Sequence, residues 1–282
     1  MRFVTFTGSD GNSRPGALVN DAVVDLSSRF RSVLSIILGG AEAFSAAKEL
    51  ATAAASRFSL EEVKLLAPIP DPPRIFCIGL NYRDHAIESK MEIPKVPTVF
   101  LKLPSALIGD REAIQLPSTS AQPDYEVEFA CVIGKDGFRI RREDWQKYVF
   151  GYTILNDVSA RDVQLATSQW TLGKSFNTFA PLGPAIVTKD EIADPHALDI
   201  RLSINGEVLQ HSNTRELIFK LPDLIAYISS IVPLLPGDII STGTPAGVGL
   251  GRTPQRWLKP GETVTCEVAG LGQLVNPVVA GE

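Results

Sequence analysis

Two glutamates stand two positions apart in the segment PDYEVEFACVIGK (residues 123–135), whose composition is otherwise that of a buried strand. In a β-strand, residues i and i+2 point to the same face. Glu126 and Glu128 are therefore expected side by side. Two like charges at this spacing repel each other, and burial makes the pair less favourable still unless a cation neutralises it.

A divalent metal ion would resolve this repulsion, because carboxylates supply the hard oxygen ligands that such ions prefer. Asp157 is the candidate third ligand, since it follows the apolar part of YTILNDVS where a helix is expected to begin. The alternative is that the glutamates lie on the wet face of an edge strand and that Asp157 caps the helix. The spacing alone leaves both interpretations open.

A candidate general base lies in GLNYRDHAIESKMEIP (79–94). His85 and Glu88 are three residues apart and are neighbours on one helical turn. A carboxylate beside an imidazole can orient it for proton transfer. The other histidines, His196 in ADPHAL and His211 in LQHSNT, lie in polar segments that read as loops, and we interpret them as structural.

The segment STGTPAGVG (241–249) follows an apolar strand and is rich in small residues. Small side chains let the backbone approach a ligand closely, and Thr244 offers a hydroxyl group. The alternative is a tight turn. The segment is not a P-loop, because no Gly-Lys-Ser/Thr follows it.

Composition narrows the class of protein. The 282 residues are 44% hydrophobic and 21% charged, with a formal net charge of −5 and no basic run. Nucleic acid and an anionic membrane surface are therefore not expected as partners. The three cysteines are far apart in apolar segments, which predicts reduced core residues in a cytoplasmic protein. No apolar run is long enough to span a membrane, and the first residues lack the apolar core of a signal peptide.

The elements that position these residues fall into two regions. Residues 1–65 are expected to form a small N-terminal α/β domain with short strands and an Ala-rich helix at 41–58. LAPIPDPPR (66–74) holds four prolines in nine residues, which predicts a linker. Residues 75–282 form the second expected domain.

Within this second domain, the pattern predicts many short strands and few helices. IFCIGL and VPTVFLKLP read as buried strands, and Asn205-Gly206 between alternating flanks predicts a hairpin. One helix is expected from Ser159, with Asp162 completing a capping box, and another from Pro222. These elements together predict an α+β fold that is mainly β, with accessory helices.

Seven segments, in order from about residue 70 to the end, resemble the fumarylacetoacetate hydrolase (FAH) family: GLNYRDHAIE, FLKLPSALIG, DYEVEFACVIGK, GYTILNDVSARDVQ, WTLGKSFNTFAPLGP, INGEVLQ and STGTPAGVG. VTKDEIADPH and STGTPAGVGLGRTPQRWLKPGE are most similar to the subgroup called FAH domain-containing protein 2. The first 65 residues resemble the small, variable N-terminal domain of such members.

The resemblance implies a mixed β-sandwich roll of the FAH type, one Mg²⁺ or Mn²⁺ ion, a small-molecule substrate and a homodimer. The roles that it implies are metal ligation by Glu126, Glu128 and Asp157, catalysis by His85, Glu88 and Lys174, and substrate binding by Gln164, Arg161 and Thr244. One position departs from the family pattern KSFDTF, because Asn177 stands where many members have aspartate.

Family substrates are small β-diketo or 2-oxo acids. The resemblance implies hydrolysis of a C–C bond in an acylpyruvate or fumarylpyruvate-like acid, with the metal stabilising an enolate and His85–Glu88 activating water. The alternatives are decarboxylation of oxaloacetate and keto–enol tautomerisation or isomerisation. An alternative of another class is a catalytically silent metal-binding scaffold. The intact His85–Glu88 pair favours hydrolysis.

Overall fold

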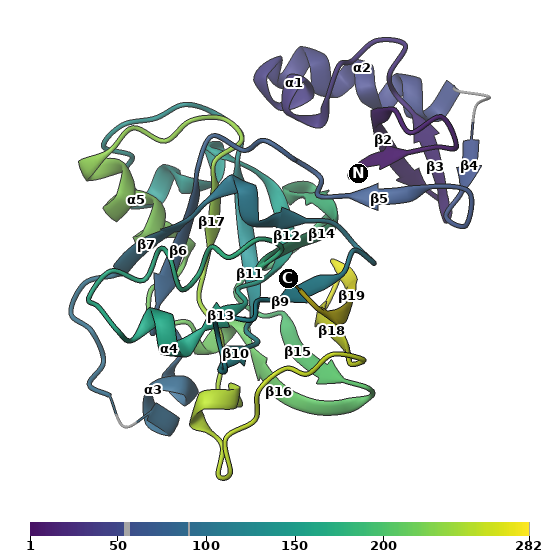
Figure 1. Cartoon of the computed structure of the whole chain (residues 1–282). Coiled ribbons are helices and arrows are strands. Elements are labelled where there is room, and N and C mark those ends of the chain that lie inside the picture. Colours follow the sequence, from purple (N-terminus) through teal and green to yellow (C-terminus); the bar gives the residue numbers. More distant parts are fainter. Residues whose placement is uncertain (54–56, 90, 282) are drawn as a thin grey trace.

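The computed structural model describes residues 1–53, 57–89 and 91–281. Its strands form a 12-stranded sheet, a five-stranded sheet and a two-stranded ribbon (Figure 1). The large sheet has the order β4-β3-β2-β1-β14-β12-β11-β17-β6-β7, with β5 on β1 and β8 on β14. Its strands are β1 (Arg2–Thr7), β2 (Ser13–Val19), β3 (Ala22–Asp25), β4 (Arg57–Ser59), β5 (Lys64–Leu66), β6 (Ile75–Gly79), β7 (Thr98–Lys102), β8 (Leu107–Ile108), β11 (Val127–Ile133), β12 (Val149–Asn156), β14 (Ala180–Thr188) and β17 (Ile239–Ser241).

The five-stranded sheet has the order β16-β15-β18-β19-β9 and packs against the large sheet. Phe129 and Ile154 of the large sheet share one buried cluster with Leu202, Val264 and Leu274 of the smaller one. The α+β class with mainly β content is therefore confirmed. The remaining strands are β9 (Ile114–Leu116), β15 (Asp199–Ile204), β16 (Glu207–Asn213), β18 (Thr263–Val268), β19 (Gly272–Ala280) and the ribbon β10 (Pro123–Asp124) and β13 (Ser159–Ala160).

The N-terminal region extends one edge of the large sheet. β1 pairs with β2 on one side, and through Arg2 and Phe3 it pairs with β14 on the other. Helices α1 (Val33–Leu38) and α2 (Gly40–Ala53) cover these strands. The helix expected at 41–58 is wrong at its end, because Arg57–Ser59 pairs with β3 as β4, and residues 54–56 lie outside the described residues.

The Pro-rich segment lies where the linker is expected. Leu66 still belongs to β5, and residues 67–74 contain no helix or strand. In Figure 1 the N-terminal elements lie to one side of the main body and join it through this segment. The domain boundaries 1–65, 66–74 and 75–282 stay a prediction.

Helices are few in the second region: α3 (Arg83–Ser89), α4 (Arg161–Gln164), α5 (Leu221–Ile231) and short 3₁₀ turns η1 (Pro104–Ala106), η2 (Arg142–Lys147), η3 (Lys189–Glu191), η4 (Thr214–Glu216) and η5 (Gly249–Gly251). Helix α5 has Pro222 in its first turn, as predicted, and its apolar side joins the core. In the part of the chain that the structure describes, no helix is long and apolar enough to cross a membrane.

The capping box expected at Ser159 is wrong. Ser159 belongs to β13, and its hydroxyl donates to the carbonyl oxygen of Asp157. The Asp162 carboxylate accepts instead from the Ser120 hydroxyl and the Ala121 amide. Because Ser159 is used in strand pairing and Asp162 contacts residues 120–121, the four-residue helix α4 has no side-chain cap.

Two further expectations need correction, while the hairpin is confirmed. β7 is an edge strand with Val99 and Leu101 more than a third exposed, so it is not a buried strand. His211 lies on β16 and not in a loop. The predicted hairpin joins β15 to β16, and both turn residues, Asn205 and Gly206, have positive φ. The cysteines, as expected of core residues, are buried and free: Cys77, Cys131 and Cys266.

Candidate metal centre and active-site pocket

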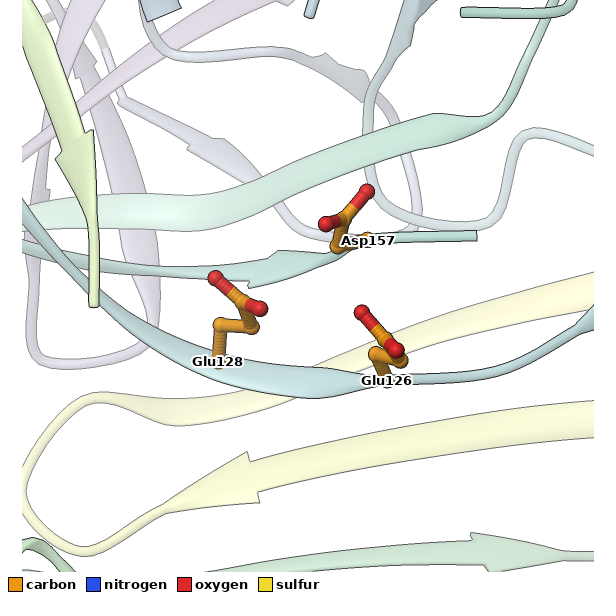
Figure 2. Close-up of side chains that lie close together, drawn as sticks. All are labelled: Glu126, Glu128 and Asp157. Carbon is orange, nitrogen blue, oxygen red and sulfur yellow. The ribbon is translucent and has the colours of Figure 1, made fainter. Parts of the chain in front are cut away.

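The three predicted carboxylates meet at one end of two neighbouring strands. Glu128 lies in β11, Glu126 directly precedes it, and Asp157 directly follows β12. Because β11 and β12 are antiparallel, the amide of Asp157 donates to the carbonyl oxygen of Glu126 at 2.9 Å. One carboxylate oxygen from each residue lies within 4.8 Å of the others. In Figure 2 the two glutamates rise side by side from one strand toward Asp157.

The wet-edge alternative is excluded by burial. β11 lies inside the sheet, between β12 and β17, and Glu126 and Glu128 are 5% and 1% exposed. The side chains that alternate with the two glutamates face the core, as the two-residue period predicts: Tyr125, Val127 and Phe129.

Two of the carboxylates are held by buried cations. Lys174 donates to Glu126 at 2.6 Å and to Asp157 at 2.8 Å, and Arg161 donates to Glu126 at 2.6 Å. Burial opposes ionisation of Glu126, but the Lys174 ammonium and the Arg161 guanidinium lower its pKa to about 2. Burial likewise opposes the charge of Lys174, while Asp157 and Glu126 raise its pKa to about 12.

Glu128 differs from its neighbours because it forms no ion pair among the described residues. It accepts hydrogen bonds from the Ser241 hydroxyl at 2.5 Å and the Gly243 amide at 3.1 Å. Burial, and after it the charges of Asp157 and Glu126, raise the pKa of Glu128. Ionised Glu128 therefore lacks a positive partner.

This charge balance fits a divalent cation. With Glu128 ionised, the buried cluster has four carboxylates, Asp124, Glu126, Glu128 and Asp157, against three cations, Lys102, Arg161 and Lys174, which leaves one negative charge in excess. Hard oxygen donors in this number suit Mg²⁺ or Mn²⁺ rather than a metal that prefers sulfur or imidazole. Glu126, Glu128 and Asp157 are the residues that would hold the ion.

The predicted contact between His85, the candidate general base, and Glu88 is also formed. His85 and Glu88 lie on α3, with Nδ1 of the imidazole 3.2 Å from Oε2 of the carboxylate. Glu88 is itself anchored, since both of its oxygens accept from the Gly247 amide, at 2.9 and 3.1 Å. A β-carbon at Gly251 would lie 2.8 Å from the Glu88 carboxyl carbon. Gly247 in the glycine-rich segment and Gly251 just after it thus bring the backbone close to Glu88.

All of the predicted site residues except Glu88 line one cavity of about 170 Å³. They are His85, Glu126, Glu128, Asp157, Arg161, Gln164, Lys174 and Thr244. Apolar side chains, including Ile78, Phe100 and Trp170, complete its wall. This volume is small beside the 300–1,000 Å³ of drug-sized sites, so the pocket suits a small acid.

The expected substrate-binding residues differ in what they can still offer. The Arg161 guanidinium donates hydrogen bonds to Asp124, Glu126 and the amide oxygen of Gln164. This contact leaves the Gln164 NH₂ group as the donor available to a ligand. The Thr244 hydroxyl donates to the Val127 carbonyl and accepts from Gln210, each at 2.9 Å, so it mainly ties its loop to β11.

Sequence reasoning missed Lys102, which is 1% exposed and donates to Asp157 at 2.6 Å. Its ammonium also contacts the carbonyl oxygens of Val158 and Lys174. A signal was present in TVFLK, where alternation places Lys102 on the same strand face as Phe100. It also missed Asp124, which binds Arg161 and the amides of Gly249 and Leu250.

The family is established by comparison with known proteins. The family model for the fumarylacetoacetate (FAA) hydrolase C-terminal region matches residues 74–279. The chain therefore belongs to the fumarylacetoacetate hydrolase family, and the predicted family and FAH-type fold are confirmed.

Individual relatives refine this assignment. The chain is 45% identical, over 99% of its length and 90% of the relative, to a Xenopus laevis protein named oxaloacetate tautomerase fahd2, mitochondrial. It is 49% identical, over 77% of its length and 70% of the relative, to human oxaloacetate tautomerase FAHD2A, mitochondrial. The predicted subgroup, FAH domain-containing protein 2, is thus confirmed. The chain is an enzyme of this family rather than a catalytically silent scaffold.

A solved structure supports both the fold and the metal. Maleylpyruvate hydrolase from Sphingobium sp. SYK-6, in complex with manganese(II) and pyruvate, aligns over 100% of both chains with a TM-score of 0.85 and 32% identity. A manganese ion in this relative agrees with the oxygen-rich cluster of Glu126, Glu128 and Asp157.

The predicted cytoplasmic location is wrong, because both curated relatives are named mitochondrial. The prediction was based on the reduced cysteines, which are free and buried as expected. Reduced thiols persist in any reducing compartment. Reduced cysteines therefore do not distinguish the cytosol from another reducing compartment.

Proposed function

We propose that the enzyme catalyses keto–enol tautomerisation of oxaloacetate. The observation that carries the proposal is one small cavity that holds both a histidine base and a buried carboxylate cluster, in a chain close in sequence to oxaloacetate tautomerases. This was the alternative at the sequence level, and it is favoured over C–C hydrolysis. Tautomerisation moves one proton and needs no room for a water molecule or a departing acyl group.

The base can act from a defined atom. Because Nδ1 of His85 contacts Glu88, Nε2 is the ring nitrogen available to take a proton from C3 of oxaloacetate. The proton is then delivered to the oxygen on C2, so atoms and charge balance without a co-reactant. A bound Mg²⁺ or Mn²⁺ ion would polarise that oxygen and stabilise enolate character.

Cations beside the pocket suit a dicarboxylate. The Lys174 ammonium has three donors, of which two are used by Glu126 and Asp157, so one remains for the substrate. The Gln164 amide supplies a neutral donor on the same wall. These groups would hold the carboxylates of oxaloacetate while His85 moves the proton.

The test follows the decay of the enol absorbance of oxaloacetate in wild type and His85→Gln, with Mg²⁺, with Mn²⁺ and with a chelator. The variant should slow tautomerisation by about 10²- to 10⁴-fold, the usual contribution of a positioned base. His211→Gln is the matched control, because His211 is exposed on β16. A wild-type rate equal to that of buffer would exclude the proposed reaction.

C–C hydrolysis of an acylpyruvate is the second candidate. It is favoured by the intact His85–Glu88 contact and by the likeness to a maleylpyruvate hydrolase. Pyruvate release from acylpyruvates, measured beside pyruvate release from oxaloacetate, separates hydrolysis from decarboxylation. Faster acylpyruvate cleavage than enol turnover would make hydrolysis the main activity. For either reaction, losses in His85→Gln and Glu88→Gln should not add, because the two residues act as one unit.

The proposal includes two finer features. Mg²⁺ and Mn²⁺ accept the same oxygen ligands, so activity after reconstitution with each ion decides between them. The homodimer rests on the family resemblance, and light scattering during gel filtration measures the mass.

A further inference from the structure

A second and larger cavity, of about 550 Å³, lies between the helices of the N-terminal region and the ends of three strands in the large sheet. The helices contribute Ile37, Gly40, Ala41 and Phe44. The strand ends and their connections contribute Gly134, Lys135, Lys147, Val149, Phe150, Thr188, Lys189 and Asp190. A volume of this size falls within the range of small-molecule sites.

The cavity is remote from the active-site pocket. Gly134 follows the last residue of β11, six positions from Glu128, and β12 enters the cavity at Val149 and ends beside Asp157. At a rise of roughly 3.3 Å per residue, the two sites are about 20 Å apart along these strands. No residue lines both cavities. A ligand here would not contact the substrate.

The inner wall of the cavity is apolar. The rings of Phe44 and Phe150 meet edge to face with centroids 6.2 Å apart. Ile37 and Val149 are buried and also line the cavity. Such a wall offers a dry contact for an aromatic or aliphatic group.

The rim is positively charged, although the chain has a net charge of −5. Three lysines face one carboxylate, that of Asp190. Lys147 pairs with Asp144, but in the described part of the chain neither Lys135 nor Lys189 forms an ion pair. Lys135 lies 5.8 Å from the Tyr148 ring centroid, and Lys189 donates to the Gln146 carbonyl.

Burial lowers the pKa of Lys189, while Cys131 and Asp190 oppose the shift. The first turn of the 14-residue helix α2 also borders the cavity, and its amide groups add partial positive charge that the carboxylate of Glu42 in the same turn offsets in part. An anion is the ligand that the excess of lysines at the rim favours.

We propose that this cavity is a second ligand site, which binds a small organic carboxylate with an aromatic or aliphatic body. The body would lie against Phe44 and Phe150, and the carboxylate would lie between Lys135 and Lys189. The cavity is too apolar on its inner wall for a polyphosphate and too charged at its rim for a neutral hydrocarbon. The site is independent of the proposed tautomerase activity.

Calorimetric titration with 4-phenylbutyrate tests the proposal, with 4-phenylbutanol as the uncharged analogue. The acid should bind at least about fivefold more tightly than the alcohol, the scale of one partly exposed ion pair. Its affinity should fall as salt is raised. Failure of wild type to bind the acid, or equal affinity for acid and alcohol, would overturn the proposal.

Variants place the binding in this cavity. Ala41→Trp should abolish binding by filling the cavity, and the exposed position of Ala41 lets the fold accept the change. Lys135→Gln and Lys189→Gln should each weaken binding about fivefold. Lys259→Gln, an exposed lysine outside the cavity, is the matched control and should change nothing. Unchanged affinity in Ala41→Trp would assign the binding elsewhere and refute the site.

Enzyme turnover distinguishes this result from the proposed function. Ala41→Trp should keep the wild-type rate of oxaloacetate tautomerisation, because Ala41 contacts none of the pocket residues that surround Asp157. Loss of acid binding with normal turnover supports the second site. Binding that disappears in Glu126→Ala but persists in Ala41→Trp would place 4-phenylbutyrate in the active site instead.

Discussion

The two ends of β11 and β12 carry opposite charge in opposite surroundings. At one end, Glu126, Glu128 and Asp157 are buried, and buried cations contact Glu126 and Asp157 directly. At the other end, Lys135 and Lys147 are exposed at the rim of an apolar cavity. The same two strands thus have a buried anionic cluster at one end and a solvent-exposed cationic cluster at the other.

The difference shows how burial changes the meaning of an unpaired charge. A solvated lysine needs no partner, so Lys135 becomes informative only through the apolar wall beside it. A buried carboxylate must be paired or neutralised. Among the described residues Glu128 has hydrogen-bond donors but no cationic partner, so its carboxyl group must be protonated or neutralised by a bound cation.

Replacement of the carboxylates should have the largest effect. Glu126→Ala, Glu128→Ala and Asp157→Ala should each abolish the proposed tautomerase activity, because each removes a candidate metal ligand. Calorimetric titration with Mn²⁺ checks the cause, and unchanged affinity in all three variants would refute the metal site.

The same residues should differ in their effect on the stability of the metal-free protein. Glu126→Gln removes the carboxylate that Lys174 and Arg161 share and leaves each cation with one carboxylate, Asp157 or Asp124. It should cost up to about 3–5 kcal/mol of unfolding free energy, the scale of a broken buried pair. Glu128→Gln removes only repulsion and should leave stability equal or higher. Urea unfolding in chelator compares them, and equal losses would contradict the charge balance described for the cluster.

The buried lysines should give the next largest effect, and they form a matched pair because both contact Asp157. Lys174→Met should lower kcat/KM by about 10²- to 10³-fold, since it removes a donor that lines the pocket. Lys102→Met should act through Asp157 instead, weakening Mn²⁺ binding and destabilising the fold. Steady-state kinetics at saturating Mn²⁺ separate them: activity of Lys102→Met should recover with added metal, whereas that of Lys174→Met should not.

Much of the candidate site was predictable because its residues lie in short segments with strong periodicity. The two-residue period placed Glu126 and Glu128 on one face, and the helical period brought His85 to Glu88. The family resemblance supplied Lys174 and Gln164, which local patterns could not. Lys102 escaped because a lysine in an edge strand is ordinarily expected to face solvent.

The fold errors have a common cause, which is that tertiary contacts override local signals. Ser159 and Asp162 match a capping box, yet strand pairing uses Ser159 and a distant loop uses Asp162. The Ala-rich helix should have continued on propensity alone, but Arg57–Ser59 completes the sheet edge beside β3. The second cavity joins elements remote in sequence, and no local pattern indicates it.

The smallest expected effect concerns His196, which lies near the cationic end of β12. Its ring packs on Trp145 of η2, and its Nε2 accepts from the Leu221 amide at the start of α5. Burial lowers the pKa of His196 from 6.5, and Lys220 adds to this, while Asp194 and Asp223 oppose it. The unfolded chain therefore binds the proton more readily, so the stability contributed by neutral His196 is complete above about pH 6.5 and is lost as the pH falls through the lowered pKa.

His196→Gln should flatten this part of the pH dependence, because glutamine keeps a hydrogen-bond acceptor but does not titrate between pH 5 and 8. The expected change is about 1 kcal/mol, the scale of one hydrogen bond. Urea unfolding at several pH values between 5 and 7.5 measures it, with the exposed His211→Gln as control. Equal slopes for wild type and His196→Gln would mean that the proton is taken up without breaking the contact to Leu221. An acid-induced loss of unfolding free energy would then arise elsewhere in the protein. The region around the cationic end of β12, whose lysines are solvated, would not contribute to the pH dependence of stability between pH 5 and 7.5.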